Sequence, residues 1–523
     1  MPQYRVPGVY IEEIQRGPRP IEGVPTSIAA FVGETERGAV WPRLVTSYKE
    51  YSRIYGSVFR DQRYMPYAVN GFFENGGNRL YIARVVGKGA TTAQKTFGDF
   101  TIRAAGPGAW GRRIWIRIQD GSTVAPDGTT GFRLRAAYWT SVDASFRPYD
   151  PFDPKNNLRL PRPQHVEDFD NLSVDPDAPN FFEKVLLDSV TGLPVSTLAL
   201  IERTTLDSMS KPPNNDVNGE FLDQGGEDGS DPLNDEDYVG GKDVGRSDVQ
   251  GLSALELDAF RDIALVYAPH PPDHEVAIVK KVIDHCERLR FRFAVIDSSD
   301  TEPAGLDPRT SIKDSAWAGF YTPWIVVPDL QAGTRTAIPP GGHVLGVYAR
   351  TDLERGVFIA PANETLRGAL DLRFNVTDDL QRVLNLRGVN VIRSFTGRGI
   401  RVWGARTLSS DGEWKYVNVR RLFAFLERSI YEGTQWVVFE PNDDRLWTRV
   451  RGTIGQFLGS QWRAGAFLGR TDDEAYFVRC DRTTMTQDDI LNGRLICEIG
   501  VAALKPAEFV IFRLFQHTIE GQQ

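Results

Sequence analysis

Cysteine is scarce in this chain of 523 residues, which contains three: Cys286, Cys480 and Cys497. None belongs to a CxxC pair, and three thiols cannot form the disulfide framework of a small secreted domain. Cys286 follows Val282 and Ile283 on an apolar helix face, and the other two lie in strand-like runs. We therefore predict that all three are reduced and packed in hydrophobic cores.

Long apolar runs are also missing. No segment approaches the roughly 18 uncharged apolar residues of a membrane span. The first twenty residues, MPQYRVPGVYIEEIQRGPRP, contain several prolines and no apolar segment of the kind found in a signal peptide. These absences predict a protein that is made in the cytoplasm and does not insert into a membrane, and they leave release by cell lysis open.

Motifs for catalysis are absent or imperfect. Residues 106–111 match GxGxxG, but the following RRIWIRI alternates as a strand does, whereas a dinucleotide site needs a helix there. His270 and His274 have the spacing of a zinc-binding helix, but Pro271 and Pro272 between them prevent that helix. We predict no catalytic residues, no cofactor and no metal, and thus a protein that is not an enzyme.

Charge is unevenly distributed. The net charge of −8 argues against a nucleic-acid-binding protein. Residues 216–243 hold ten acidic residues and one lysine, with few aromatics, which predicts a mobile and dispensable loop on the outer surface. Residues 390–470 hold thirteen basic and seven acidic residues, a local charge of +6, so this region is expected to face an acidic partner.

The order of elements predicts a multidomain α/β (α+β) protein. Residues 262–268 and 291–296 are apolar strands around an amphipathic helix, which is a βαβ unit. A second helix carries a stripe from Val419 to Ile430, and the chain ends in apolar strands. The expected parts are an N-terminal arm (1–24), a middle α/β domain (25–95 with 251–340), a β-rich outer insertion (96–250, its acidic mobile loop at 205–250) and a C-terminal α/β core domain (341–523).

Several motifs resemble those of the contractile tail sheath family of bacteriophages and related injection systems. The N-terminal motifs are PGVYIEE (7–13), RPIEGVPTS (19–27) and AFVG (30–33), and a weaker one is GPGAWG (106–111). The strongest lie in the C-terminal third: NVIR (390–393), RGIRVWGARTL (398–408), WKYVNVRR (414–421) and FEPN (439–442). The resemblance covers roughly residues 1–110 and 250–520.

This resemblance implies a subunit that stacks in sixfold rings around an inner tube and contracts to drive the tube through a target envelope. It also implies baseplate and terminator or cap proteins as partners, and arms that exchange between neighbouring subunits. A non-contractile tube or shell protein, or an unrecognised enzyme, remains the alternative. Whether the particle is a phage, a bacteriocin or a cell-released system stays open.

Two groups of residues are expected to make these contacts. An arm or terminal strand without a core of its own suits pairing with a neighbouring chain, which favours these residues for exchange: Val9, Tyr10, Ile11, Phe509, Ile511 and Phe512. Basic side chains of the last third suit an acidic tube surface, which favours these arginines: Arg420, Arg421, Arg445, Arg449 and Arg451.

Overall fold

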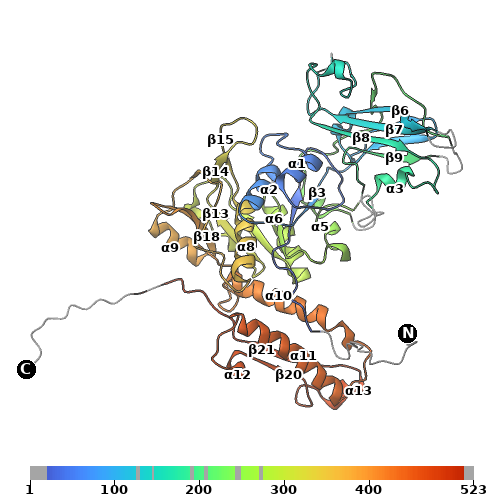
Figure 1. The fold of residues 1–523 in the computed structure, drawn as a ribbon. Coiled ribbons are helices and arrows are strands. Elements are labelled where there is room, and N and C mark those ends of the chain that lie inside the picture. The colour runs from blue at the N-terminus through green and yellow to red at the C-terminus, as the bar shows by residue number, and fades with distance from the viewer. Residues whose placement is uncertain are drawn as a thin grey trace, which may run out of the picture. The chain divides into compact units, whose positions relative to one another are not determined.

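A computed structural model of the protein describes residues 20–124, 130–143, 146–188, 194–204, 210–241, 249–269, 275–509 and 511. The chain divides into two compact units (Figure 1). Residues 25–421 form the larger unit, and residues 1–24 with 422–523 form the smaller one. Helix α10 (Val417–Gly433) crosses the boundary between them. The predicted boundary at residue 341 is therefore corrected to 421/422.

A nine-stranded sheet organises the larger unit. Its six central strands are parallel, and the strand pairings toward both edges are antiparallel. Strands from both sides of residue 341 belong to it, which is why no domain boundary falls there. In spatial order the strands are β16 (Glu364–Thr365), β19 (Gly399–Val402), β18 (Val389–Phe395), β13 (Ala318–Thr322), β12 (Phe293–Asp297), β11 (Leu265–Tyr267), β1 (Ala29–Gly33), β3 (Leu80–Arg84) and β2 (Arg43–Val45).

Both faces of this sheet are covered, which explains why its central strands are mostly apolar. In β1, Ala29 and Phe31 enter one core while Ala30 and Val32 enter the other. The first core also receives α1 (Tyr48–Tyr55), α2 (Met65–Glu74) and α8 (Gly341–Arg355). The second receives α4 (Asp235–Val239), α5 (Gly251–Ala254), α6 (Glu275–Leu289) and α9 (Asp378–Leu386). The parallel pair β11–β12 around α6 confirms the predicted βαβ unit.

A small antiparallel sheet and a short helix complete this part of the larger unit. The strand order is β15 (Arg335–Ile338), β14 (Ile325–Pro328) and β17 (Asp371–Leu372), and the helix is α7 (Pro308–Ser311). Ile325, Val327 and Ile338 bury their side chains in the first core, so the small sheet packs against the same helices as the large one.

The insertion has antiparallel sheets and its own core. One sheet has the order β10 (Glu220–Phe221), β6 (Ile114–Val124), β7 (Thr130–Tyr138) and β8 (His165–Leu172). The other has the order β4 (Gln94–Phe97), β5 (Phe100–Ala104) and β9 (Ala199–Arg203), and α3 (Phe182–Leu186) packs beside them. Figure 1 shows these elements in cyan and green at one end of the larger unit. The alternation in RRIWIRI (112–118) therefore marks a real strand, β6.

The acidic segment differs from its prediction. Strand β10 pairs with β6, and Leu222, Leu233 and Tyr238 are buried. Its carboxylates form ion pairs with basic residues elsewhere in the chain: Glu220 and Asp223 with Lys95, Glu227 with Arg112, Asp228 and Asp231 with Arg60, and Asp235 with Lys281. For residues 210–241 the prediction of a mobile loop is therefore wrong, because apolar side chains spaced among the charges attach the segment to the core. That the segment is dispensable for assembly stays a prediction.

The smaller unit combines helices with a two-stranded sheet. Its apolar core is formed by side chains of α10 and of α11 (Asp444–Arg463). In this core the Phe425 and Phe457 rings lie 6.0 Å apart. The described start of the chain packs here, since Ile21 is buried and Val24 N–H donates to Ser429 Oγ at 3.1 Å. The remaining elements are α12 (Asp472–Ala475), β20 (Tyr476–Arg479), α13 (Gln487–Leu491) and β21 (Glu498–Val501).

Candidate assembly surfaces

The sheet of the smaller unit offers open edges. Strands β20 and β21 pair only with each other among the described residues, in the antiparallel register that places Val478 opposite Ile499. The backbone groups on their outer edges are thus available to strands from elsewhere. Phe477 and Ile499 also remain exposed on this sheet. A pair of strands is marginal on its own, so an added strand would stabilise it.

The residues expected to exchange between subunits lie at the chain ends. Phe509 and Ile511 are 75% and 77% exposed, and no helix or strand includes them in the described part. Val9, Tyr10, Ile11 and Phe512 lie outside the described residues. The structure thus leaves two large apolar side chains in solvent at one end, while the exchange itself stays a prediction.

Two of the expected tube-facing arginines are buried inside the larger unit. The Arg420 guanidinium lies between the rings of Trp317 and Trp414, 4.1 and 4.3 Å from their centroids. Arg421 donates to the Asp352 carboxylate at 2.9 and 2.5 Å, and both side chains are at most 4% exposed. These groups are occupied within their own unit, so their assignment to the tube is withdrawn. The sequence could not reveal this, because Asp352 is 69 positions away.

The other three arginines lie on α11, which Asp443 caps by accepting from two backbone N–H groups. Arg445 is exposed, and no ion pair involves its side chain within the described chain. Arg449 approaches Glu440 at 3.5 Å, and Arg451 approaches Asp481 at 3.6 Å, both across partly exposed surface. Exposed pairs of this kind are weak, so these guanidinium groups can exchange partners.

The open face of α11 includes Gly452 and Gly455, a feature that the sequence reading missed. A Cβ atom at either position would meet nothing within 4 Å in the described structure. The arginines named above are their neighbours on the helix. Backbone without side chains therefore lies beside the positively charged guanidinium groups. Glycine inside a helix costs up to about 1 kcal/mol relative to alanine. The signal in the sequence was two glycines within an otherwise regular helical pattern.

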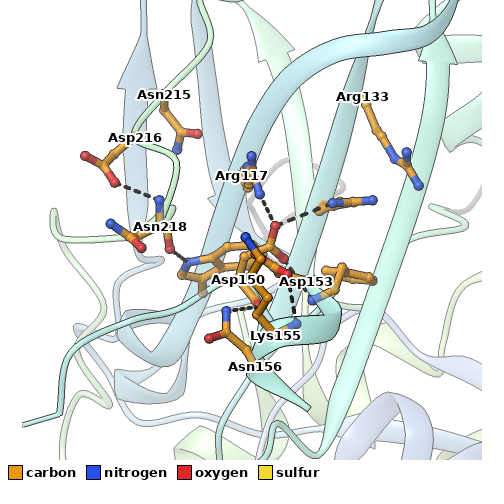
Figure 2. A network of polar contacts seen from close by, with 12 residues as sticks. Arg117, Arg133, Asp150, Asp153, Lys155, Asn156, Asn215, Asp216 and Asn218 are labelled. Atoms are coloured by element: carbon orange, nitrogen blue, oxygen red, sulfur yellow. Dashed lines mark hydrogen bonds and ion pairs between the residues drawn. The ribbon is translucent and has the colours of Figure 1, made fainter. Parts of the chain in front are cut away.

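A polar network ties the insertion together (Figure 2). Arg117 and Arg135 both contact the buried Asp150 carboxylate, Arg135 at 3.5 Å. Trp115 Nε1 donates to the Asn218 carbonyl at 2.6 Å, which attaches the acidic segment to β6. Asp216 Oδ1 accepts from Asn218 N at 2.7 Å, a local turn. Each carboxylate here is satisfied by protein donors, so the arrangement is structural.

The region that matches GxGxxG is a turn before a strand. Residues 109–113 form a 3-10 helix, and β6 follows directly. Gly108 has φ 122° and Trp110 is buried. Within the described residues no cluster of three metal-ligating side chains occurs, and no helix there is long and apolar enough to cross a membrane. His270 and His274 lie outside the described residues.

Solved structures share this architecture over nearly the entire chain. A chain of the contracted sheath complex of an extracellular contractile injection system (PVC) is 24% identical, with 99% of each chain covered and a TM-score of 0.57. A chain of the anti-feeding prophage baseplate is also 24% identical, with 98% of this chain and 100% of that chain covered and a TM-score of 0.55. The fold is therefore the one found in contractile injection systems.

Sequence comparisons narrow this class. The phage tail sheath protein central domain matches residues 249–408, and the phage tail sheath C-terminal domain matches residues 409–517. A prophage major tail sheath protein of Pseudomonas aeruginosa is 24% identical over 196 residues, which span 37% of this chain and 49% of that protein. The chain thus spans about half the length of this relative. It belongs to the phage tail sheath family.

Proposed function

We propose that the protein is the sheath subunit of a contractile, phage-tail-like particle. It assembles as stacked sixfold rings around an inner tube and shortens to drive the tube through a target envelope. The observation that carries this proposal is the sheath-family match over residues 249–517, together with a fold shared along almost the whole chain with a contracted sheath. Subunits joined head to tail by a rotation that does not close form such helical tubes.

The chain ends are proposed to join neighbouring subunits. The outer edges of β20 and β21 are open, and Phe509 and Ile511 are exposed on the C-terminal segment. Strand addition by arms carrying Val9, Tyr10 and Ile11, or Phe509, Ile511 and Phe512, would satisfy the edge backbone. Arms of this kind act as hinges, so the contacts survive rotation of the rigid parts during contraction.

The tube is proposed to bind the α11 face through Arg445, Arg449 and Arg451. Each exposed ion pair contributes only about 0.2–1 kcal/mol, so attachment relies on repetition along the sheath and is released when the lattice widens. Baseplate and cap proteins are the remaining partners in this proposal. The particle is assembled in the cytoplasm and released with the cell contents. The role is mechanical, so no catalytic turnover is expected.

A truncation tests the assembly directly. Ile21 and Val24 anchor the described start of the chain on α10, so the deletion should remove residues 1–19 and keep 20–24. Negative-stain images of the full protein should show striated cylinders. The truncated protein should remain folded by circular dichroism and form none. Cylinders of normal length from the truncated protein would contradict the arm exchange, and a full-length protein that stays monomeric would contradict the sheath function itself.

A further inference from the structure

Cys480 and Cys497 face each other at the end of the β20–β21 sheet. The register pairs Val478 with Ile499 and Arg479 with Glu498, so the next position outward places Cys480 opposite Cys497. Each thiol also shifts the pKa of the other, as expected of neighbouring sulfur atoms. Both sulfur atoms thus lie on the same side of one antiparallel pair.

The alternation of backbone hydrogen bonds shows which type of pair this is. Ala502 N–H donates to the Ala475 carbonyl at 2.9 Å, so these residues form a hydrogen-bonded pair. Counting along the register, Arg479 with Glu498 is again hydrogen-bonded, and Cys480 with Cys497 is not. At such positions the Cα atoms are typically about 4.5 Å apart and the side chains are closest. This separation is within the range of about 4.4–6.8 Å that a disulfide bridges.

We propose that Cys480 and Cys497 are a disulfide site, oxidised by exchange with a small disulfide such as oxidised glutathione. One sulfur attacks the small disulfide and releases one thiol. The second sulfur then attacks the mixed disulfide and releases the other, so two protons and two electrons pass from the protein to the oxidant. This revises the expectation that these two cysteines stay reduced; Cys286 keeps that expectation, since residues 25–421 contain no other cysteine.

The surroundings set the order and the rate of these steps. Cys497 is partly exposed and Cys480 is buried, so the small disulfide can reach Cys497 first, and Cys480 resolves the intermediate. Burial, with the neighbouring Cys480 thiol, raises the pKa of Cys497 to about 12, and burial also raises the pKa of Cys480. Since the thiolate is the attacking form, exchange is slow at neutral pH and faster in alkaline buffer. A reducing cytoplasm would keep both cysteines as thiols, and an oxidising medium would favour the disulfide.

The consequence of closure is local. A two-stranded sheet is marginally stable, and the covalent bond would hold β20 and β21 in register while the segment with α13 loops between them. This chemistry does not depend on the proposed sheath role, because it follows from the register and the paired thiols alone.

Thiol mapping of the purified full-length protein tests the proposal. The protein is incubated in mildly alkaline buffer with excess oxidised glutathione or with dithiothreitol, and free thiols are then alkylated in denaturant. After oxidation only Cys286 should carry the alkyl group, and the tryptic digest should contain the peptide that begins at Cys480 joined to the one that begins at Leu495. After dithiothreitol all three cysteines should be alkylated.

Two variants serve as controls. Cys286→Ser should leave the cross-linked peptide pair unchanged, and Cys497→Ser should remove it. The proposal is overturned if Cys480 and Cys497 stay fully alkylated after prolonged oxidation, or if glutathione remains on Cys497 while Cys480 stays free. Because the wild-type digest decides the matter, misfolding of a variant would not obscure the result.

Discussion

At the scale of single residues, the larger unit depends on charges that are buried and matched. Arg421 and Asp352 are at most 4% exposed, and Arg421 also donates to the Thr26 carbonyl at 3.1 Å. Removing one partner of such a pair leaves the other charge buried without compensation, which costs about 3–5 kcal/mol. Arg421→Ala should therefore lower the urea midpoint of this unit sharply, as measured by circular dichroism. Arg445→Ala, at an exposed site, should leave the midpoint unchanged; equal effects would contradict this account.

His343 predicts how stability depends on pH. Burial lowers the pKa of His343 to about 4, whereas the unfolded chain has the ordinary value of 6.5. Between these values the unfolded state binds the proton and the folded state does not, so stability falls as pH falls from about 6.5 to 4. The loss reaches at most about 3 kcal/mol. Urea unfolding at several pH values should show that the free energy of unfolding falls less for His343→Leu than for the wild type between pH 6.5 and 4. An equal fall in both proteins would show that other groups cause the acid sensitivity.

Residue roles were harder to predict than residue environments. The sequence correctly marked the last third as basic, but it could not distinguish Arg421, which is paired with Asp352, from Arg445, which is exposed. The strand-like runs around Cys480 and Cys497 likewise did not reveal that the two cysteines lie opposite each other in the sheet. In each case the partner is distant in sequence, and only the fold brings the two side chains together.

At the scale of elements, helices α2 and α8 pack at a distance that only glycine permits. A Cβ atom on Gly346 would lie 2.5 Å from the Phe72 carbonyl oxygen and 2.6 Å from Asn75 Cβ. Gly346→Ala should therefore destabilise the larger unit by about 1–3 kcal/mol, the usual cost of overpacking. Gly452→Ala, on the open face of α11, provides the matched control and should stabilise the smaller unit by up to about 1 kcal/mol. Thermal unfolding of both variants measures the contrast, and a neutral Gly346→Ala would contradict the close packing.

The elements themselves were largely predictable where one physical signal dominated. Continuous apolar runs such as β1 and β12 mark strands covered on both faces, and the stripe from Val419 to Ile430 marks α10. The prediction for the acidic segment failed because its buried residues Leu222 and Tyr238 belong to apolar runs of only two residues, Phe221-Leu222 and Tyr238-Val239. Such short runs among charges give no periodicity, although long-range contacts bury them. The predicted domain boundary at residue 341 was wrong because the nine-stranded sheet combines strands from both sides of that residue, such as β13 and β18.

At the scale of the whole molecule, the α11 arginines should govern attachment to the tube. Reversing Arg445, Arg449 and Arg451 together to Glu should abolish co-sedimentation of the protein with its tube while the circular dichroism spectrum stays unchanged. Binding should be lost completely because it depends on many weak ion pairs that are repeated along the sheath, and the triple change removes them from every subunit. Reversal of Arg355, Arg373 and Arg382, which are at least half exposed elsewhere on the chain, is the control and should have little effect. Unchanged co-sedimentation of the first variant would exclude the α11 face.

The central claim is that copies of this chain form a lattice that changes length. Electron cryo-microscopy of the assembled particles, before and after triggering, measures it most directly. The account predicts sixfold rings in both states, with a smaller axial rise and a larger diameter after contraction, and with the chain ends of neighbouring subunits added to the β20–β21 sheet in each. A single invariant lattice, a closed shell or a protein that never polymerises would contradict it.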